Sequence, residues 1–440
     1  MEHKLNLITQ IARIDKDCKF NNLIHLVTEN SLRDCFKQLG KSKASGIDNV
    51  TKAEYEKDLE KNLDNLLQRM KRMSYYPQAV RRTYIPKVGG KLRPLGIPAL
   101  EDKLVQMAMS KILEAIYEVD FHDNSYGYRK GRSCHDALAR INSRIMGKPV
   151  NYIIDADIKG FFDNVDHYWL LRFLKVRVAD KRFLVYIERF LKSGVMKDGE
   201  YQDTEEGTPQ GGSISPILAN IYLHYVLDRW FNRNIQTKCP GYTDLVRYCD
   251  DFVICAQRKS EAYRILDRIK RRVSRFGLEL SEEKTGIVEF GRFAAANRGK
   301  EGKRAETFYF LGFTHYCSRS RNGKFKVGRK TEKSRYRKGL KKVKEFVKKN
   351  RNLLKLEEIW KRVKSMLTGH FRYYGVNENI RSLCNFLYEV TKLLFKWLNR
   401  RSQRRSFNWD KFSLYLKRYP LPSPKIYNNL YEIANRSEWQ

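Results

Sequence analysis

The chain has 440 residues and carries a formal charge of +37, from 87 Lys and Arg against 50 Asp and Glu. Its hydrophobic content of 42% is ordinary for a folded protein, which argues against a chain that is disordered throughout. So large a positive excess repels itself unless a polyanion offsets it, and the basic residues are interleaved with Tyr, Phe and Trp, so a nucleic acid is the expected partner.

The cysteines argue against a zinc-ribbon protein, and the apolar runs argue against a secreted or membrane protein. No two of the eight cysteines form a C-x-x-C pair, so we expect no zinc ribbon. No apolar run reaches the length of a signal peptide or a membrane span. We therefore expect no membrane partner and a reducing, cytoplasmic location.

Helices are predicted from the amino terminus to about Met73, because apolar residues recur there at helical spacing. Over residues 84–98 the pattern changes to short extended pieces on either side of a glycine pair, which is typical of a hairpin. A helix is predicted next, over residues 100–119.

Strands with aspartates at their ends are predicted in the middle of the chain. A buried strand is expected over residues 151–157, and two strands around a tight turn are expected over residues 245–255. Helices are predicted over 167–193, 214–233 and 260–276. Alternating strands and helices of this kind indicate a second, mixed part of the fold.

Beyond about residue 320 the strand and turn signals fade. The last 120 residues hold 32 Lys and Arg against 9 Asp and Glu, a net charge of +23. Three stretches with apolar residues at helical spacing predict a packed bundle of three helices, and the first, Lys341 to Lys349, is cationic outside a narrow apolar stripe. We therefore expect domains over residues 1–125, 126–320 and 321–440.

Two short aspartate motifs suit phosphoryl transfer. Reaction at a nucleoside triphosphate places charge on the attacking and leaving oxygens, which two Mg²⁺ ions about 4 Å apart stabilise, and Mg²⁺ prefers hard oxygen ligands. Asp157 ends one predicted strand, and Asp250 and Asp251 lie at the predicted turn. Each motif alone also occurs in solvated loops, and Asp155 is a rival because it lies on the same strand face as Asp157.

Several motifs, in their order along the chain, resemble those of reverse transcriptases encoded by group II introns. The palm motifs are Asp157-Ile158-Lys159-Gly160-Phe161-Phe162-Asp163, Gly207-Thr208-Pro209-Gln210-Gly211-Gly212-Ser213-Ile214-Ser215-Pro216 and Tyr248-Cys249-Asp250-Asp251. The fingers motifs are Ile85-Pro86-Lys87, Arg93-Pro94-Leu95-Gly96-Ile97-Pro98 and Ser125-Tyr126-Gly127-Tyr128-Arg129. Further on, Phe310-Leu311-Gly312-Phe313 is similar to the last palm strand of that branch, and Gly369-His370-Phe371-Arg372-Tyr373-Tyr374 to its maturase, or X, domain.

The resemblance implies an α+β, right-hand polymerase fold. The expected parts are an N-terminal extension and fingers over 1–125, a palm over 126–320, and a helical thumb or maturase domain over 321–440. Cys249 stands where this branch usually has Ala, a small-for-small change that should leave the aspartates in place. The similarity ends before the zinc-binding HNH endonuclease domain that many relatives add, so we expect no nicking of a target strand.

The implied activity is RNA-directed DNA synthesis. By resemblance, Asp157, Asp250 and Asp251 would hold two Mg²⁺ ions, helped by the backbone carbonyl of Ile158. The predicted strands agree with this assignment, since these carboxylates sit at neighbouring strand ends.

Four residues match the family's contacts with the incoming nucleotide: Lys87, Arg93, Phe162 and Gln210. Lys87 and Arg93 flank a hairpin turn, from which cationic side chains can reach phosphates; an ordinary exposed hairpin is the alternative. An aromatic ring at Phe162 would exclude a ribose 2′-hydroxyl by its bulk, and it would also suit a core position. Gln210 precedes two glycines, which let backbone approach a substrate closely.

The C-terminal domain is expected to bind structured RNA. Its candidate contacts are cationic or aromatic: Lys341, Lys342, Lys344, Arg400, Arg401, Arg404, Arg405 and Trp409. Four arginines within six residues, near a ring that can stack, suit a phosphate backbone, while a solvated helix face is the alternative. His370 is expected to be a packed or capping side chain rather than a ligand.

The implied partners are group II intron RNA or another structured RNA template, a DNA primer or target, and deoxynucleoside triphosphates, in the bacterial cytoplasm or nucleoid. Two alternatives stay open. A domesticated, defence-associated or CRISPR-associated reverse transcriptase would keep the chemistry without a splicing role. A protein that only binds intron RNA as a splicing factor would usually have lost catalytic aspartates, and all three are present here.

Overall fold

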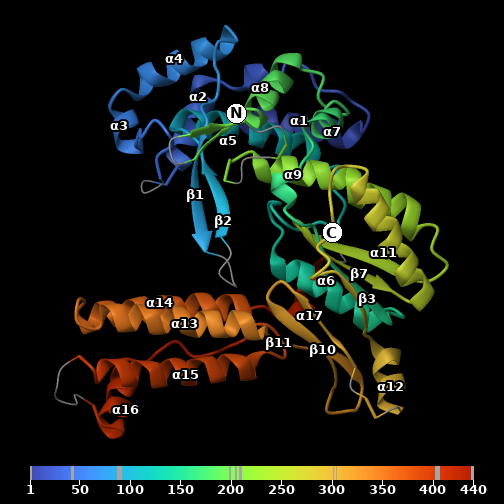
Figure 1. The fold of residues 1–440 in the computed structure, drawn as a ribbon, viewed down its shortest axis with the longest axis vertical. Coiled ribbons are helices and arrows are strands. Elements are labelled where there is room, and N and C mark those ends of the chain that lie inside the picture. The colour runs from blue at the N-terminus through green and yellow to red at the C-terminus, as the bar shows by residue number, and fades with distance from the viewer. Residues whose placement is uncertain are drawn as a thin grey trace.

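The computed structural model describes residues 2–40, 44–86, 92–197, 200–203, 206–207, 211–300, 302–303, 305–401 and 407–437. Within them the chain forms a curved molecule of three parts: amino-terminal helices with a hairpin, a central sheet with helices around it, and a group of long helices (Figure 1). The strand pairs are antiparallel apart from the parallel pair β1 and β4. The predicted α+β class is confirmed. No helix in the described part of the chain is both long and apolar enough to cross a membrane.

The amino-terminal part is packed around α5 (Leu100–Tyr117), which is buried on most of its faces and contacts α1 and α2. The other helices are α1 (Glu2–Ile14), the 3₁₀ turn Ile24–Leu26, α2 (Glu29–Gln38), α3 (Lys52–Lys57) and α4 (Leu59–Lys71). Capping boxes at Thr28 and Thr51 start α2 and α3, because each hydroxyl accepts a backbone N–H that the first turn leaves without a helical partner. The predicted helices up to Met73 are confirmed.

A four-stranded sheet extends from this part toward the centre of the molecule (Figure 1). Its order is β2-β1-β4-β5, formed by β1 (Val80–Pro86), β2 (Leu92–Ile97), β4 (Val195–Lys197) and β5 (Glu200–Gln202). β1 and β2 pair in register from Arg81 opposite Ile97 to Pro86 opposite Leu92, which confirms the predicted hairpin. Its turn, residues 87–91, lies outside the described residues.

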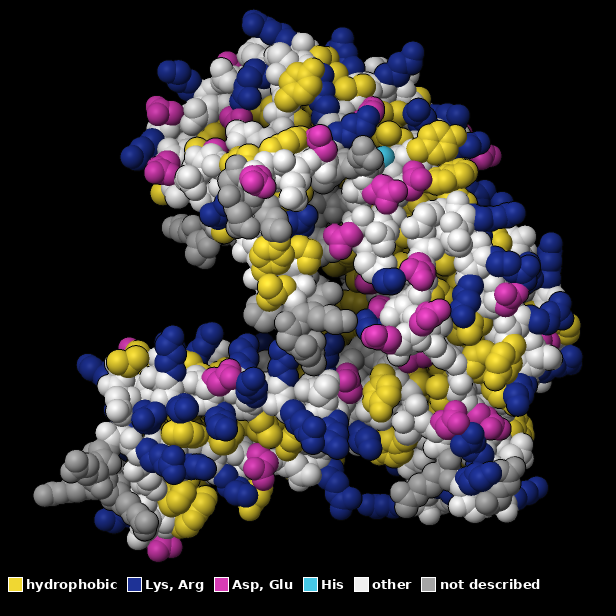
Figure 2. Space-filling model, in the orientation of Figure 1, with side chains coloured by type: hydrophobic (Ala, Val, Ile, Leu, Met, Phe, Trp, Pro, Cys, Tyr) yellow, Lys and Arg dark blue, Asp and Glu magenta, His cyan; other side chains and the backbone are white. Residues whose placement is uncertain are grey.

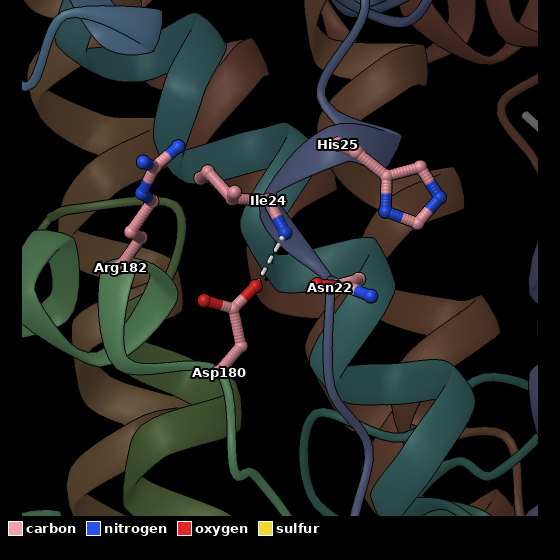
Figure 3. A pocket seen from close by; sticks show the side chains of 5 residues that line it. All are labelled: Asn22, Ile24, His25, Asp180 and Arg182. Atoms are coloured by element: carbon pink, nitrogen blue, oxygen red, sulfur yellow. Dashed lines mark hydrogen bonds between the residues drawn. The ribbon is translucent and has the colours of Figure 1, made fainter.

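The carboxylate of Asp180 joins the amino-terminal segment to the central part (Figure 3). One of its oxygens accepts the Ile24 N–H at 2.9 Å, and the other accepts the Phe183 N–H at 3.0 Å. The pocket around it, of about 460 Å³, is lined by Asn22, Ile24, His25, Asp180 and Arg182. Because both oxygens already hold two elements of the fold together, we assign this pocket a structural role.

The helices of the central part confirm the three predicted helical segments. They are α6 (Cys134–Gly147), α7 (His167–Leu174), α8 (Lys181–Leu191), α9 (Ser215–Leu223), the π-helical turns His224–Asp228 and Asn232–Gln236 on either side of α10 (Arg229–Phe231), α11 (Lys259–Ser274) and α12 (Arg292–Lys300). The helical interval predicted over 167–193 contains two helices, α7 and α8, because the Asp180 side chain caps a new helix.

The central sheet has the order β6-β7-β3-β8 and lies between two apolar layers. Its strands are β3 (Tyr152–Asp157), β6 (Thr243–Tyr248), β7 (Asp251–Ala256) and β8 (Gly286–Glu289). Alternation along β3 sends Ile154 and Ala156 into the core shared with α5, α9 and α11, and Ile153 into the core shared with α6. Asp155 and Asp157 therefore face away from α11.

A three-stranded sheet and the long helices complete the chain. The elements are β9 (Thr307–Phe310), β10 (Phe313–Arg319), β11 (Phe325–Thr331), α13 (Lys333–Asn350), α14 (Leu356–Tyr374), α15 (Ile380–Leu398), α16 (Trp409–Arg418) and α17 (Leu430–Ser437). The predicted bundle is confirmed, with α13, α14 and α15 side by side (Figure 1). The expectation of helices alone after residue 320 is wrong, because β11 lies beyond it.

Two further features of the C-terminal part are the packing of His370 and the position of the last helix. His370 stacks on Phe386 with ring centroids 3.8 Å apart, and burial lowers its pKa to about 4, so it is the packed side chain that we expected. The last helix, α17, returns to the central part: Leu430 and Ala434 lie in the core under α6. The C-terminal segment thus contributes to two cores.

Candidate active site

Three aspartates meet at the end of the central sheet. In the antiparallel pairing of β3 and β7, Asp157 lies directly opposite Asp251. Asp250 precedes Asp251 in the turn between β6 and β7, where Cys249 has a φ of 60°. Cross-strand neighbours that point to one face bring their side chains within a few ångströms, so the pairing register gathers the carboxylates predicted from the sequence.

The electrostatics of this cluster favour a bound cation. Burial, followed by repulsion from Asp155, Asp157 and Asp250, raises the pKa of Asp251 well above its ordinary value. Lys284 forms an ion pair with Asp157, and that contact raises the pKa of the ammonium although burial alone would lower it. The protein's own lysine thus offsets part of the negative charge, and the repulsion that remains is what a dication would relieve.

The donor set fits magnesium, the hard cation that carboxylate oxygens suit. Within the described residues, no three His, Cys, Asp or Glu side chains already stand at ligand geometry. The carbonyl of Ile158, which the resemblance adds to the ligand set, belongs to the residue directly after Asp157. Ile158 and Leu280 form an antiparallel bridge. Its two hydrogen bonds are made by the residues on either side: Ser281 N–H donates to the Asp157 carbonyl, and Lys159 N–H donates to the Glu279 carbonyl. The Ile158 carbonyl is therefore not used in that bridge.

Asp155, the rival from the sequence, has a different place. It lies opposite Val253 rather than opposite an aspartate, one step along the strand from the pair of Asp157 and Asp251. Burial raises its pKa to about 7, although a backbone hydrogen bond from Tyr309 acts in the opposite direction. Geometry therefore favours Asp157 as the partner of the turn aspartates.

A buried ion pair that the sequence reasoning missed supports the turn. The Arg247 side chain has 0% exposure and forms an ion pair with Asp228, whose exposure is also 0%, at 2.5 Å. The guanidinium also donates to Asn220 Oδ1 at 3.1 Å and to the carbonyl of Cys249 at 3.0 Å. Since Cys249 directly precedes Asp250, Arg247 fixes the backbone from which the aspartates project.

The segment around Gly127 packs directly against the same turn. A Cβ atom on Gly127 would lie 2.3 Å from Cys249 Sγ, so only glycine leaves room for this approach. Asn220 donates its amide to the Gly127 carbonyl at 2.8 Å, and Arg247 donates to Ser125 Oγ at 2.7 Å. Two motifs far apart in sequence therefore share one hydrogen-bonded network.

The aspartates open onto a cavity of about 800 Å³. Its lining includes Asp155, Asp157, Asp251, Lys284, the turn between β9 and β10, and residues where α13 begins and α14 ends. That turn is formed by Leu311 and Gly312, which both have positive φ, as a two-residue hairpin requires. Tyr373 donates its hydroxyl to the Leu311 carbonyl at 3.0 Å, so the end of α14 is fixed beside the turn that lines this cavity.

Comparison with known proteins decides the family. Residues 85–315, about half of the chain, match the family described as "Reverse transcriptase (RNA-dependent DNA polymerase)". The chain belongs to the reverse transcriptase family. The matched segment runs from the hairpin of β1 and β2 into β10, and it contains all three aspartates.

Several relatives of this reverse transcriptase are proteins of introns. The group II intron-encoded protein LtrA of Lactococcus lactis subsp. cremoris is 35% identical over 288 residues, which cover 52% of this chain and 48% of that protein. Protein YkfC of Escherichia coli K12 is 33% identical over 350 residues, 72% of this chain and 88% of that protein. An uncharacterised 91 kDa protein in the cob intron of Schizosaccharomyces pombe is 41% identical over 162 residues, 37% of this chain and 20% of that protein. The alignment thus spans about half the length of LtrA.

The nucleotide contacts expected in this reverse transcriptase are only partly described. Phe162 is half-buried and meets Phe161 edge to face at 5.3 Å. Lys87 and Gln210 lie outside the described residues, as does the side chain of Arg93, whose backbone pairs with Ile85.

The described glycines on either side of residues 208–210 pack closely against two other segments. A Cβ on Gly207 would meet the Phe162 carbonyl at 2.9 Å, and one on Gly211 would meet the Gly96 carbonyl at 2.4 Å. Gly211 also has a φ of 118°, which favours glycine. Gly207 therefore lies against the Phe162 segment, and Gly211 lies against strand β2.

The predicted RNA contacts lie at two places on the helical domain. Lys341, Lys342 and Lys344 are exposed on α13. At the end of α15, Arg400 lies over the Trp397 ring at 5.1 Å, and Arg401 donates to the Leu354 carbonyl at 3.3 Å.

The ring of Trp409 is 50% exposed and stacks on Phe395 at 3.9 Å, so one of its faces is already used inside the protein. Arg404 and Arg405 lie outside the described residues.

Proposed function

We propose that this reverse transcriptase copies RNA into DNA with two Mg²⁺ ions held by Asp157, Asp250 and Asp251. The observation that carries the proposal is the register that sets Asp157 opposite Asp251 at the edge of an 800 Å³ cavity. When bound, the metal ions would stabilise charge on the attacking and leaving oxygens. The direct test is primer extension on an RNA template, compared with the Asp251 variant argued in the Discussion.

The residues of the chain would position the metal ions and the nucleotide and would offset the charge of the phosphates. The strands hold the carboxylates on a rigid sheet, and the carbonyl of Ile158 would complete the ligand set. Lys87 and Arg93 would contact the triphosphate, and Gln210 the nascent pair, since charge-assisted donors bind phosphate oxygens strongly. An RNA template, a DNA primer and deoxynucleoside triphosphates are the substrates that this arrangement requires.

Phe162 would select the sugar by its bulk. Phe162→Ala is expected to raise ribonucleotide incorporation relative to deoxynucleotide incorporation, because the ring would no longer fill the space of a 2′-hydroxyl. The measurement is the ratio of the two values of kcat/KM in primer extension. An active variant with an unchanged ratio would show that Phe162 serves only the core, and Phe161→Leu, at the fully buried neighbour, is the matched control for loss of packing.

We also propose that the helical domain binds intron RNA and thereby assists splicing and mobility. The support is that LtrA is named a group II intron-encoded protein, that two intron proteins are similar to 37% of this chain, and that the last 120 residues carry a net charge of +23. A reverse transcriptase without a splicing role is the alternative. Group II ribozyme sequences in the flanking DNA would decide between them.

Replacing Arg400, Arg401, Arg404 and Arg405 together with Gln is expected to weaken binding of structured RNA and to flatten its salt dependence. Each phosphate contact contributes about 0.7 to 0.9 to the log-log slope, so the slope should fall by up to about 3. Extension of a short unstructured template should change little. Binding with the parent's affinity and slope would assign these arginines to a solvated face and leave Lys341, Lys342 and Lys344 as the contacts to test.

A further inference from the structure

Helix α11 covers the face of the central sheet opposite the aspartates. Its apolar side, which includes Ala262, Ile265 and Ile269, is buried in the core with Ile154 of β3. Asp157 and Asp251 project from the other face of β3 and β7. A ligand on the outer side of α11 would therefore be separated from the catalytic cavity by the whole thickness of the sheet.

The outer side of α11 and the residue after it carry a line of arginines, which we call the α11 stripe: Arg264, Arg268, Arg271 and Arg275. These positions are spaced i, i+4, i+7 and i+11, so they lie on one side of the helix over about 16 Å. All four side chains are exposed. Figure 2 shows Lys and Arg gathered on the outer edge of the molecule, where α11 lies in Figure 1.

The acidic residues of α11 leave most of this charge unbalanced. Asp267 is exposed and forms an ion pair with Arg271. Glu261 is buried and accepts the backbone N–H of Gly241 at 3.0 Å, so it serves the fold. Like charges three or four residues apart destabilise a helix, so the stripe is not explained by the stability of α11.

Arg272, a neighbouring arginine on α11, has a structural role that the stripe residues can be compared with. Arg272 lies off the stripe, donates to the carbonyls of Tyr225 at 3.2 Å and Val226 at 3.0 Å, and packs over Phe276 at 4.5 Å. It thereby satisfies backbone groups of the π-helical turn. Of the stripe residues, Arg268 lies over the Trp230 ring at 5.8 Å, which orders its guanidinium without neutralising it.

We propose that the α11 stripe binds the phosphate backbone of a double-stranded segment of RNA, outside the polymerase cavity. This rests on the proposed function, in which the protein binds a structured RNA, and adds a contact surface on the back of the sheet. Every stripe residue is Arg, whose planar fork matches phosphate oxygens in pairs, whereas Lys acts as a point charge. A straight, evenly spaced line of such groups fits a regular polyanion, and the exposed ring of Tyr263 beside it can contact a sugar edge.

The test uses the full chain with Arg264, Arg268 and Arg275 replaced together by Gln, which leaves the pair of Arg271 with Asp267 intact. Binding of a labelled, blunt-ended RNA duplex is measured by fluorescence anisotropy at several salt concentrations, with excess unlabelled primer–template present to fill the cavity. Each lost phosphate contact removes about 0.9 from the slope, so the slope is expected to be shallower by about two to three.

A matched control removes the same charge elsewhere. Arg319, Arg321 and Lys324 are exposed at the turn between β10 and β11, and their replacement by Gln should leave duplex binding close to that of the parent. Equal losses in the two variants, or an unchanged slope in the stripe variant, would overturn the proposal. So would a stripe-dependent preference for vesicles of anionic lipid over the RNA duplex. Primer extension on a short template keeps the two proposals apart, since failure of the parent protein to extend refutes polymerase function and leaves the binding result standing.

Discussion

Asp251→Asn is expected to abolish metal-dependent DNA synthesis and to stabilise the metal-free protein at neutral pH. The amide keeps the size of the side chain but removes a negative ligand from the proposed Mg²⁺ site, so synthesis should fall by orders of magnitude. The parent carboxyl lies buried beside Asp155, Asp157 and Asp250, and its pKa is raised on folding. Its charge therefore opposes folding at neutral pH.

The sign of the pH dependence follows from that raised pKa. The folded state binds the proton of Asp251 more tightly than the unfolded state does, so the group favours folding most at low pH, and this contribution is lost as the pH rises from the ordinary pKa of Asp through the raised value. Asp251→Asn should flatten this part of the profile. The measurement is the melting temperature of the metal-free parent and variant at several values between acid and neutral pH.

Two further measurements make the prediction specific. Added Mg²⁺ should raise the melting temperature of the parent and have a smaller effect on the variant, because a ligand that binds only the folded state stabilises it. Glu279→Gln, at an exposed acid that pairs with Lys159 at 3.1 Å, is the matched loss of one carboxylate and should retain synthesis. Full extension by Asp251→Asn would refute the assignment of the aspartates.

The aspartate cluster was predictable because its signals are local. Strand alternation and a tight turn place Asp157, Asp250 and Asp251 at strand ends, and the motif order then fixes which strands are neighbours. What no local pattern gives is the choice between Asp155 and Asp157. Both lie on one face; the resemblance to the family favours Asp157, and the pairing register agrees, since it sets Asp157 opposite Asp251.

Two features of the fold were not visible in the local sequence pattern: strand β11, and the boundary between α7 and α8. Strand β11 carries Lys326, Arg329 and Lys330, whose charge concealed its alternation in a basic region. Pairing with β10 from Phe313 opposite Thr331 makes it a strand nonetheless. The split between α7 and α8 depends on Asp180, a cap that also accepts the Ile24 N–H from the amino-terminal segment.

The pair of Asp228 and Arg247 left a weaker signal in the sequence. Arg247 lies between Val246 and Tyr248 in a predicted strand that is largely apolar, and Asp228 lies in a largely apolar helix. Opposite charges in two buried elements indicate an ion pair, because an unpaired charge in a core is costly. The π-helical turn His224–Asp228 places Asp228 at Arg247, and such turns are not readable from periodicity.

Arg247→Met is expected to lower the free energy of unfolding by about 3 to 5 kcal/mol, the usual cost of removing one partner of a buried ion pair. Asp228 would stay buried without its partner, at 0% exposure. The double variant Asp228→Leu with Arg247→Met should recover most of that loss, since an apolar pair of similar volume removes both charges. Urea unfolding of the parent, the single variant and the double variant measures both effects.

Synthesis should not recover with stability. Arg247 donates to the Cys249 carbonyl at 3.0 Å, and no methionine can replace that bond, so the turn that carries Asp250 and Asp251 would lose its support in the double variant as well. We expect a reduced kcat and a higher Mg²⁺ requirement in a well-folded protein. The matched control is Arg177→Met, at another fully buried arginine, which pairs with Asp120 at 3.1 Å and should lose stability while its folded fraction keeps its rate. If the stable double variant instead synthesises DNA at the parent's rate and Mg²⁺ midpoint, Arg247 serves the core alone, and the position of the turn must be set by Gly127 and Asn220.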